Sequence, residues 1–371
     1  MRIVHLADTH LGHRYLTKTD DSGRNQREQD IYKVFDAAID RILELDPAAV
    51  VHAGDLFDGF HPSTQAIAVA LDGFERLNDA GIPAVVCSGN HSTPRYRATK
   101  HVFSLLGRFS GVNAVWESTE VFNFDGLSIT AIPHDHGPGS LEQAIDAVQP
   151  DPNADYNVLI LHAGSDVLPR IGSREGGVVD LDPDLLEELG EFDYVALGHF
   201  HKFKAMRVNA CYSGSLERLS FNDDAKEKVI VEVDLAAGPE HAGWVTTHAL
   251  PTRPVLSLPT IDAHDVTDLH AAVLEALDGV ELDGAVLRCP IDRVSQETYR
   301  TIDMPAIERL TRPCLHFELK PQFLGAGMIK PRSAEDLRAH VAAETPEGVD
   351  QDEVLRRAEE FLDHAAMGVE Q

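Results

Sequence analysis

The sequence has little cysteine, no long apolar run and few basic residues. Its four cysteines, Cys87, Cys211, Cys289 and Cys314, form no CxxC pair, which argues against a zinc finger or a disulfide framework. We expect buried free thiols in a reducing compartment. No run of about 18 apolar residues is present, so no transmembrane helix is expected. The first residues lack the apolar core and cleavage site of a signal peptide, which predicts a cytoplasmic protein.

The shortage of lysine and arginine makes the chain strongly acidic. It has 32 basic and 61 acidic residues, a formal net charge of −29 at pH 7. A protein that holds nucleic acid usually shows a basic excess, because phosphate neutralisation supplies much of the affinity. A polyanion would therefore need bound metal or local basic patches. The candidates are Arg95, Arg97 and Lys100, and then Lys202, Lys204 and Arg207; each cluster is equally compatible with a solvated surface.

Short apolar segments alternate with amphipathic ones over roughly the first 250 residues, which indicates α/β architecture. Helices are predicted at residues 28–45 and 63–79. The predicted strands are residues 2–7, 48–53, 83–87, 120–124, 127–132, 156–161, 193–197, 206–208, 211–213, 228–234 and 244–249. The order fits two mixed sheets packed face to face, with helices outside.

The composition changes near Thr252, where a small α+β module is predicted. It has helices at residues 265–276 and 296–310 and strands at 284–290 and 314–319. An acidic, Ala-rich tail follows, with an amphipathic helix at 352–366 whose apolar face would dock on this chain or on another one. We therefore divide the chain into domains at residues 1–250, 251–322 and 323–371.

Aspartate, asparagine and histidine recur just after the predicted strands. The fragments are Asp8-Thr9-His10, Gly54-Asp55, Gly89-Asn90-His91, His162 and Gly198-His199-Phe200-His201. Each fragment alone is common, but their coincidence in this order predicts a site for two divalent cations. Carboxylates with imidazoles, and no cysteine, suit manganese, iron or zinc in a reactive site.

Two such ions, about 3.5–4 Å apart, activate water and stabilise an in-line displacement at phosphorus. Asp55 is the natural bridge between them, because one carboxylate can touch both. His91 follows the asparagine and would donate a proton to the leaving alkoxide, an effect of roughly 10²–10⁴-fold. His13, His52 and His61 lie near the motifs in the sequence, where they could support the ligands or the substrate.

These motifs resemble those of the calcineurin-like metallophosphoesterases over residues 1 to about 250. Asp8-Thr9-His10-Leu11-Gly12, Gly54-Asp55-Leu56-Phe57-Asp58 and Gly198-His199-Phe200-His201 look like the SbcD-type DNA repair nucleases. The module after Pro254 is similar to their capping domain. Residues 355–362 resemble the helix that binds an SbcC-type coiled-coil ATPase. The resemblance implies the four-layer metallophosphoesterase fold, with two face-to-face mixed sheets flanked by helices.

The resemblance also implies an activity and a ligand set. One ion would be held by Asp8, His10, Asp55 and His201, and the other by Asp55, Asn90, His162 and His199. The family cleaves DNA phosphodiesters with Mn²⁺ in double-strand-break repair, as a 3′-to-5′ exonuclease and single-strand endonuclease. It works as a homodimer with its ATPase. The dimer region would include Ile67, Leu71, Phe103 and Leu106, for which packing inside one subunit is an equal alternative.

Two residues depart from the family pattern. Ser92 stands where an acidic residue usually follows Gly-Asn-His and pairs with the histidine. Asp58 stands where some members carry a histidine that handles DNA ends. Two other functions stay open: hydrolysis of a nucleotide or other small phosphate ester, and a largely structural metal-binding role beside the ATPase. The extra domain and terminal helix favour DNA, and the net charge favours a small ester.

Overall fold

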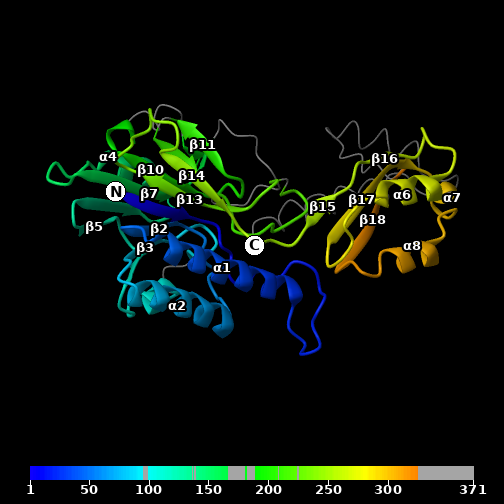
Figure 1. The fold of residues 1–371 in the computed structure, drawn as a ribbon, viewed down its shortest axis with the longest axis horizontal. Helices are drawn as coiled ribbons and strands as arrows, with labels where there is room; N and C mark the ends of the chain where they lie inside the picture. Colours follow the sequence, from blue (N-terminus) through cyan, green and yellow to red (C-terminus); the bar gives the residue numbers. More distant parts are fainter. Residues whose placement is uncertain are drawn as a thin grey trace, which may run out of the picture. The chain divides into compact units, whose positions relative to one another are not determined.

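The computed structural model describes residues 1–324, apart from residues 95–98, 136, 138, 166–179, 182–188, 208 and 224. Two of the predicted DNA contacts, Arg95 and Arg97, therefore lie outside the described residues, as does the terminal helix predicted at 352–366. Figure 1 gives the order of the described elements. Among these residues, no helix is both long and apolar enough to cross a membrane.

The first sheet has six strands in the order β14-β13-β1-β2-β3-β4. They are β1 (Arg2–Leu6), β2 (Ala49–Ala53), β3 (Ala84–Cys87), β4 (Val112–Val115), β13 (Val229–Asp234) and β14 (Val245–Ala249). β1 to β4 are parallel neighbours, whereas β13 runs antiparallel to both β1 and β14. The parallel strands are short apolar segments, nearly all buried, as expected for strands covered on both faces.

The second sheet also has six strands, in the order β11-β12-β10-β7-β6-β5. They are β5 (Glu120–Phe124), β6 (Leu127–Ile132), β7 (Tyr156–His162), β10 (Tyr194–Gly198), β11 (Lys204–Arg207) and β12 (Ala210–Tyr212). The central strands are parallel, and β5–β6 and β11–β12 are antiparallel pairs. The strands predicted at residues 120–124 and 127–132 therefore form a hairpin, and β11 and β12 form another. A further short pair joins β8 (Gly164–Ser165) to β9 (Asp180–Leu181).

A common apolar core holds the two sheets face to face. It includes Ile3 and Val51 of the first sheet and Ile129, Val158 and Ala196 of the second, all fully buried. Because alternate residues of a strand point to opposite faces, each sheet also presents an outer apolar face that must be covered. The predicted face-to-face sheets are confirmed.

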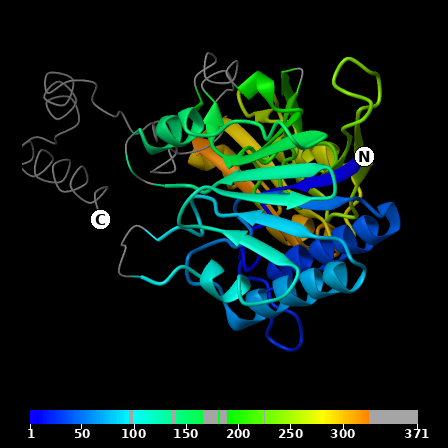
Figure 2. The ribbon, with the colours of Figure 1, turned by 90° about the vertical axis from the view of Figure 1, so that its left-hand side faces the viewer.

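Helices cover the two outer faces. α1 (Gln26–Leu45) and α2 (Thr64–Asp79) pack on the first sheet through Phe35 and Phe74 (Figure 2). Asn25 and Ser63 cap their first turns by accepting backbone N–H bonds, which fixes where each helix begins. α4 (Ser140–Asp146) and the 3₁₀ turn η1 (Leu189–Glu191) cover the outer face of the second sheet, and Ile145 of α4 packs into the core there. The four-layer α/β architecture is confirmed.

The short helix α3 (Phe103–Leu106) decides part of the dimer prediction. Phe103 and Leu106 are fully buried in the core beneath α1 and α2, whereas Leu105 is about half exposed. Phe103 and Leu106 therefore pack inside one subunit and cannot form a dimer face. Ile67 and Leu71 are partly buried against the same core.

Residues after 251 form a second group of short elements. They are β15 (Val255–Ser257), β16 (Ile261–Asp262), α6 (Leu269–Leu277), β17 (Val286–Val294), α7 (Gln296–Tyr299), α8 (Met304–Leu310) and β18 (His316–Phe323). The strands form one sheet in the order β15-β17-β16, with β18 also paired to β17. The prediction of one helix over residues 296–310 is wrong. Asp303 caps a new helix and Pro305 occupies its first turn, so the chain breaks into α7 and α8.

The chain divides into two compact units. One contains Met1–Ile261, His270–Pro290 and Asp303–Lys320, and the other contains Asp262–Leu269, Ile291–Ile302 and, of the described residues, Pro321 to Leu324. The domain boundaries at residues 250 and 322 stay a prediction. All four cysteines are free, and Cys87, Cys211 and Cys289 are buried, as predicted.

Candidate metal centre

The predicted ligands meet because their strands end side by side. Asp8 and His10 follow β1, Asp55 follows β2 and Asn90 follows β3, and these strands are parallel neighbours. In the second sheet, His162 ends β7, and His199 and His201 follow its parallel neighbour β10. The facing sheets therefore bring carboxylates and imidazoles together at one edge. Side chains of this kind at the carboxyl ends of parallel strands commonly form the site of an α/β protein.

One group of ligand atoms surrounds the ring of His162. Its Nε2 lies 2.9 Å from Asn90 Oδ1 and 3.1 Å from Asp55 Oδ2. On the opposite side of the ring, Nδ1 donates to the carbonyl of Ala53 at 2.8 Å. Because a carbonyl only accepts, Nδ1 carries a hydrogen, and Nε2 is the nitrogen that faces the two oxygens and that a metal would bind. The ring of His199 is 5.5 Å away, centre to centre.

A second group surrounds His10. Its Nε2 is fully buried, lies 3.9 Å from Asp55 Oδ2, and has no hydrogen-bond partner among the described residues. Its Nδ1 contacts Asp58 Oδ1 at 3.1 Å. Ligand atoms of Asp8, His10 and His201 lie within 4.8 Å of one another, as do those of Asp8, Asp55 and His162.

Two glycines permit this close approach. A Cβ on Gly54, whose φ is +94°, would lie 2.2 Å from His162 Nδ1. A Cβ on Gly89 would lie 2.3 Å from Asp55 Oδ1 and 2.6 Å from the Asp55 nitrogen. Any other residue would push the ligands apart, which explains the glycines before Asp55 and Asn90.

Four predicted ligands adopt backbone conformations that side chains rarely take. The φ angles are +50° at Asp8, +49° at His10, +52° at Asp55 and +118° at His199. Each such residue costs of order 1–3 kcal/mol and is found mostly where function requires the geometry. All four residues stand just after a strand, where the chain turns.

The charges of the buried side chains depend strongly on one another. Burial raises the pKa of Asp8 to about 6. Burial also acts against ionisation of Asp55, but His162 outweighs it and holds the pKa of that carboxyl well below its usual range. Conversely, Asp55 overcomes the effect of burial on His162 and raises its pKa to about 9. Burial, with His10 nearby, keeps the pKa of His201 well below its usual range, so its ring is neutral.

These features fit divalent cations. Two buried carboxylates require positive charge, and the imidazole nitrogens and the amide oxygen converge at contact distance. His10 Nε2, which has no hydrogen-bond partner within the described ranges, is a polar atom that a metal would satisfy. Oxygen and imidazole ligands without thiolates suit a hard or borderline ion such as Mn²⁺, Fe²⁺ or Zn²⁺.

His91 stands beside the cluster. Its backbone N–H donates to Asp55 Oδ1 at 2.9 Å, and its ring is 4.7 Å from the ring of His10, centre to centre. Its Nδ1 donates to the carbonyl of Asp58 at 3.0 Å, so Nε2 is the nitrogen that gains or loses a proton. Ser92 is fully buried and bonds within the turn to Gly89. The backbone carbonyl of Asp58 thus orients His91 from Nδ1.

The remaining predicted residues fall into two groups. Asp58 contacts His10, and buried His52 contacts Thr9 through Nε2 at 2.8 Å, so both support the segments that carry ligands. Lys100, Lys202 and Lys204 are exposed. Their positions are compatible with DNA contacts and equally with a solvated surface.

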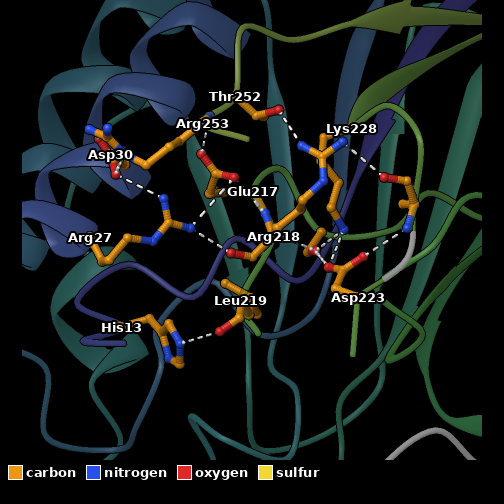
Figure 3. Close-up of polar contacts among 12 residues, drawn as sticks. His13, Arg27, Asp30, Glu217, Arg218, Leu219, Asp223, Lys228, Thr252 and Arg253 are labelled. Carbon is orange, nitrogen blue, oxygen red and sulfur yellow. Dashed lines mark hydrogen bonds and ion pairs between the residues drawn. The ribbon is translucent and has the colours of Figure 1, made fainter. Parts of the chain in front are cut away.

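Sequence reasoning missed a buried charged cluster next to the candidate ligands, drawn in Figure 3. It includes Arg27, Asp30, Glu217, Arg218, Asp223, Lys228 and Arg253. No motif marks these residues. The only hint in the sequence is a lysine directly before the apolar strand β13.

Comparison with known proteins finds a matching family and several similar proteins. The family model for calcineurin-like phosphoesterases matches residues 1–203. The chain is 32% identical over 239 residues to the DNA double-strand break repair protein Mre11 of Methanocaldococcus jannaschii, covering 61% of this chain and 60% of that protein. The Mre11 protein of Methanococcus maripaludis is 30% identical, over 60% of this chain and 59% of that protein. The Mre11 protein of Sulfurisphaera tokodaii is 29% identical, over 56% of this chain and 51% of that protein. The chain thus spans about half to three fifths of the length of these relatives.

Proposed function

Because this chain belongs to the calcineurin-like phosphoesterase family and is a phosphoesterase, we propose that it cleaves DNA phosphodiesters in double-strand-break repair. The observation that carries the proposal is the set of ligand atoms at the ends of β1, β2, β3, β7 and β10. His162 Nε2 facing Asp55 and Asn90, with His10 Nε2 buried and unpartnered among the described residues, supports a two-metal site. The printed name of the relatives supports DNA as the substrate.

We assign the ligands in two sets. Asp8, His10, Asp55 and His201 would hold one ion, and Asp55, Asn90, His162 and His199 the other. When bound, the ions supply an activated water and stabilise the charge that develops on phosphorus oxygens. Ala53 and Asp58 orient the rings of His162 and His10 through their Nδ1 atoms. Mn²⁺ is the ion we propose.

His91 is our candidate proton donor to the leaving alkoxide. Because Nδ1 is engaged by the Asp58 carbonyl, the transferable proton would sit on Nε2. The ring contacts His10 from the side of the cluster, which places an acid next to the cations without requiring it to bind them. Ser92 does not contribute to this role, because its hydroxyl faces Gly89.

Three further parts of the proposal concern assembly. We propose a coiled-coil ATPase partner of the SbcC type, which the motif resemblance implies, held by the helix predicted at residues 352–366. We also propose a homodimer, through α2 and the exposed side of α3 and not through Phe103 or Leu106. A pull-down of the ATPase with the full chain and with a chain lacking residues 350–371 tests the helix; equal recovery removes that assignment.

The decisive experiment compares a labelled linear DNA duplex with bis-p-nitrophenyl phosphate, with Mn²⁺ and with the ATPase present. We expect cleavage of both by the wild type, as a 3′-to-5′ exonuclease and single-strand endonuclease on DNA. The variant His91→Ala should lose roughly 10²–10⁴-fold in rate. Hydrolysis of the small ester without DNA cleavage would refute the nuclease and favour the alternative, a small-ester phosphodiesterase suggested by the net charge of −29.

A structural metal-binding subunit is the other alternative. It predicts bound metal with no hydrolysis of either substrate. The strained backbone at four of the proposed ligands supports an enzyme, because such strain is found mostly at functional sites.

A further inference from the structure

We propose that Lys228 is a positioning residue for the metal ligand His201, and that it acts together with Ser215 and Asp223 on the main chain of that histidine. The inference rests on the proposed function, because that proposal makes His201 a ligand. Nothing in the motifs assigns Lys228 a role.

The backbone carbonyl of His201 is held from several sides. Lys228 Nζ donates to it at 2.6 Å, and the backbone N–H of Ser215 donates at 3.2 Å. Lys228 also donates to Ser215 Oγ at 2.8 Å and forms an ion pair with Asp223. The side chains of Lys228 and Asp223 are 1% and 5% exposed. His201 itself lies in the segment between β10 and β11, where no strand hydrogen bonds fix its main chain.

The turn beneath His201 fits the same segment closely. Gly214 has a φ of +79°, and a Cβ there would lie 2.8 Å from the Phe203 nitrogen and 3.0 Å from the His201 carbonyl oxygen. Ser215 Oγ also donates to the carbonyl of Glu217 at 2.8 Å. The segment from His201 to Phe203 therefore rests on residues 214 and 215, with the ammonium of Lys228 between them.

The support continues outward through the charged cluster in Figure 3. Buried Glu217 lies 3.6 Å from Arg27 and accepts a backbone bond from Arg218 at 2.7 Å. Arg218 donates hydrogen bonds to the backbone carbonyls of Ala225 and Lys226. Both residues lie between Asp223 and Lys228 in the sequence. Within the cluster, Arg218 thus braces the chain at Ala225 and Lys226, between Asp223 and Lys228.

The energetics favour a role beyond fold stability. Burying an ammonium and a carboxylate costs several kcal/mol for each ion, and well-packed apolar residues often stabilise a fold equally well. An apolar side chain at position 228 could not donate to the His201 carbonyl, however. A rigid ligand segment is what a metal site needs, because outer groups that hold the ligands typically contribute 10- to 100-fold in metal affinity.

The test measures Mn²⁺ binding directly, by calorimetry on the full chain. The variant Lys228→Met combined with Asp223→Asn removes the donor without leaving a lone buried carboxylate. We expect one of the two Mn²⁺ sites to weaken by about 10- to 100-fold and the other to keep its affinity. The matched control is Arg253→Met, which removes a cation of the same cluster that bonds Asp30 and does not touch the His201 segment. It should leave both affinities unchanged.

A milder variant keeps the test decisive if the double variant does not fold. Ser215→Ala retains the Lys228–Asp223 pair and removes only the hydroxyl, and it should weaken the same site by roughly 2- to 10-fold. Unchanged Mn²⁺ affinity in a folded variant, or an equal loss in Arg253→Met, would overturn the proposal. Wild-type protein that binds two Mn²⁺ but cleaves no DNA would refute the nuclease function alone. The role of Lys228 would still be tested, because the Mn²⁺ affinities of the variants can be compared with that of the wild type.

Discussion

Asp58 offers the sharpest test of how the candidate centre is built. Its Oδ1 accepts from His10 Nδ1 at 3.1 Å and from His13 Nδ1 at 2.9 Å. The opposite nitrogen of His10 is the buried Nε2 that we assign to the first ion, and it has no hydrogen-bond partner in the part of the chain that the structure describes. The substitution Asp58→Asn keeps the shape of the side chain and removes its negative charge.

The magnitude follows from this geometry. A carboxylate behind a metal-binding imidazole raises its basicity and fixes its orientation, and its loss typically costs 10- to 100-fold in metal affinity or activity. This corresponds to about 1.4–2.7 kcal/mol. The side chain of Asp58 is 34% exposed, and the oxygen of an asparagine can still accept both bonds, so mainly the charge is lost. We therefore expect about 10-fold weaker Mn²⁺ binding for Asp58→Asn and a larger loss for Asp58→Ala.

The assay is calorimetric titration with Mn²⁺, together with the Mn²⁺ dependence of bis-p-nitrophenyl phosphate hydrolysis. His13→Ala is the matched control, because it removes the other bond to Asp58 and leaves His10 in place. It should change the Mn²⁺ affinity by less than about 2-fold. If Asp58→Asn binds Mn²⁺ as the wild type does, or if His13→Ala loses as much, then Asp58 does not act through His10.

Three further predictions concern stability. Burial lowers the pKa of His5 to about 3, below the unfolded value of 6.5, so the native state binds fewer protons than the unfolded state. The contribution of His5 to the free energy of unfolding should therefore be complete above pH 6.5 and fall by up to ~1.4 kcal/mol per pH unit between pH 6.5 and 3. Urea titrations without metal should show this slope weakened in His5→Gln, and an unchanged slope would contradict the assignment. A Cβ on Gly198 would lie 1.8 Å from the Ala53 carbonyl oxygen, so Gly198→Ala should lower the free energy of unfolding by at least ~1–3 kcal/mol. The control Gly190→Ala, where a Cβ would meet open space, should change it little. Equal urea midpoints for the two variants would show that the sheets relax freely. Mn²⁺ at about 100 times its dissociation constant should stabilise the fold by ~2.7 kcal/mol in thermal melts, and His162→Ala should lose most of this gain; a gain of the same size in the variant would place the ion elsewhere.

The sequence was sufficient for the parts of this protein that local chemistry specifies. Strand ends can be predicted because apolar β-branched segments stop at Gly54, Gly89 and Gly198, and polar residues of metal-binding type follow each one. The helix caps at Asn25 and Ser63 lie within three residues of the predicted helix starts. In these places a few neighbouring residues decide the conformation, so periodicity and residue type are enough.

Elsewhere, partners distant in sequence decide, and no local pattern records them. From the sequence, Phe103 is equally compatible with a dimer interface and with a core. In the structure it is buried in the core that also contains residues of α1 and α2. His91 lacks the expected acid at Ser92, and the fold supplies the carbonyl of Asp58 from another strand end instead. Lys228 is unremarkable in sequence, yet packing brings its ammonium to the His201 carbonyl 27 residues away. The sequence alone thus determined which chemical groups stand at the strand ends. Only the tertiary structure decided what orients them, because a side chain's orientation depends on hydrogen bonds to groups that folding alone brings near.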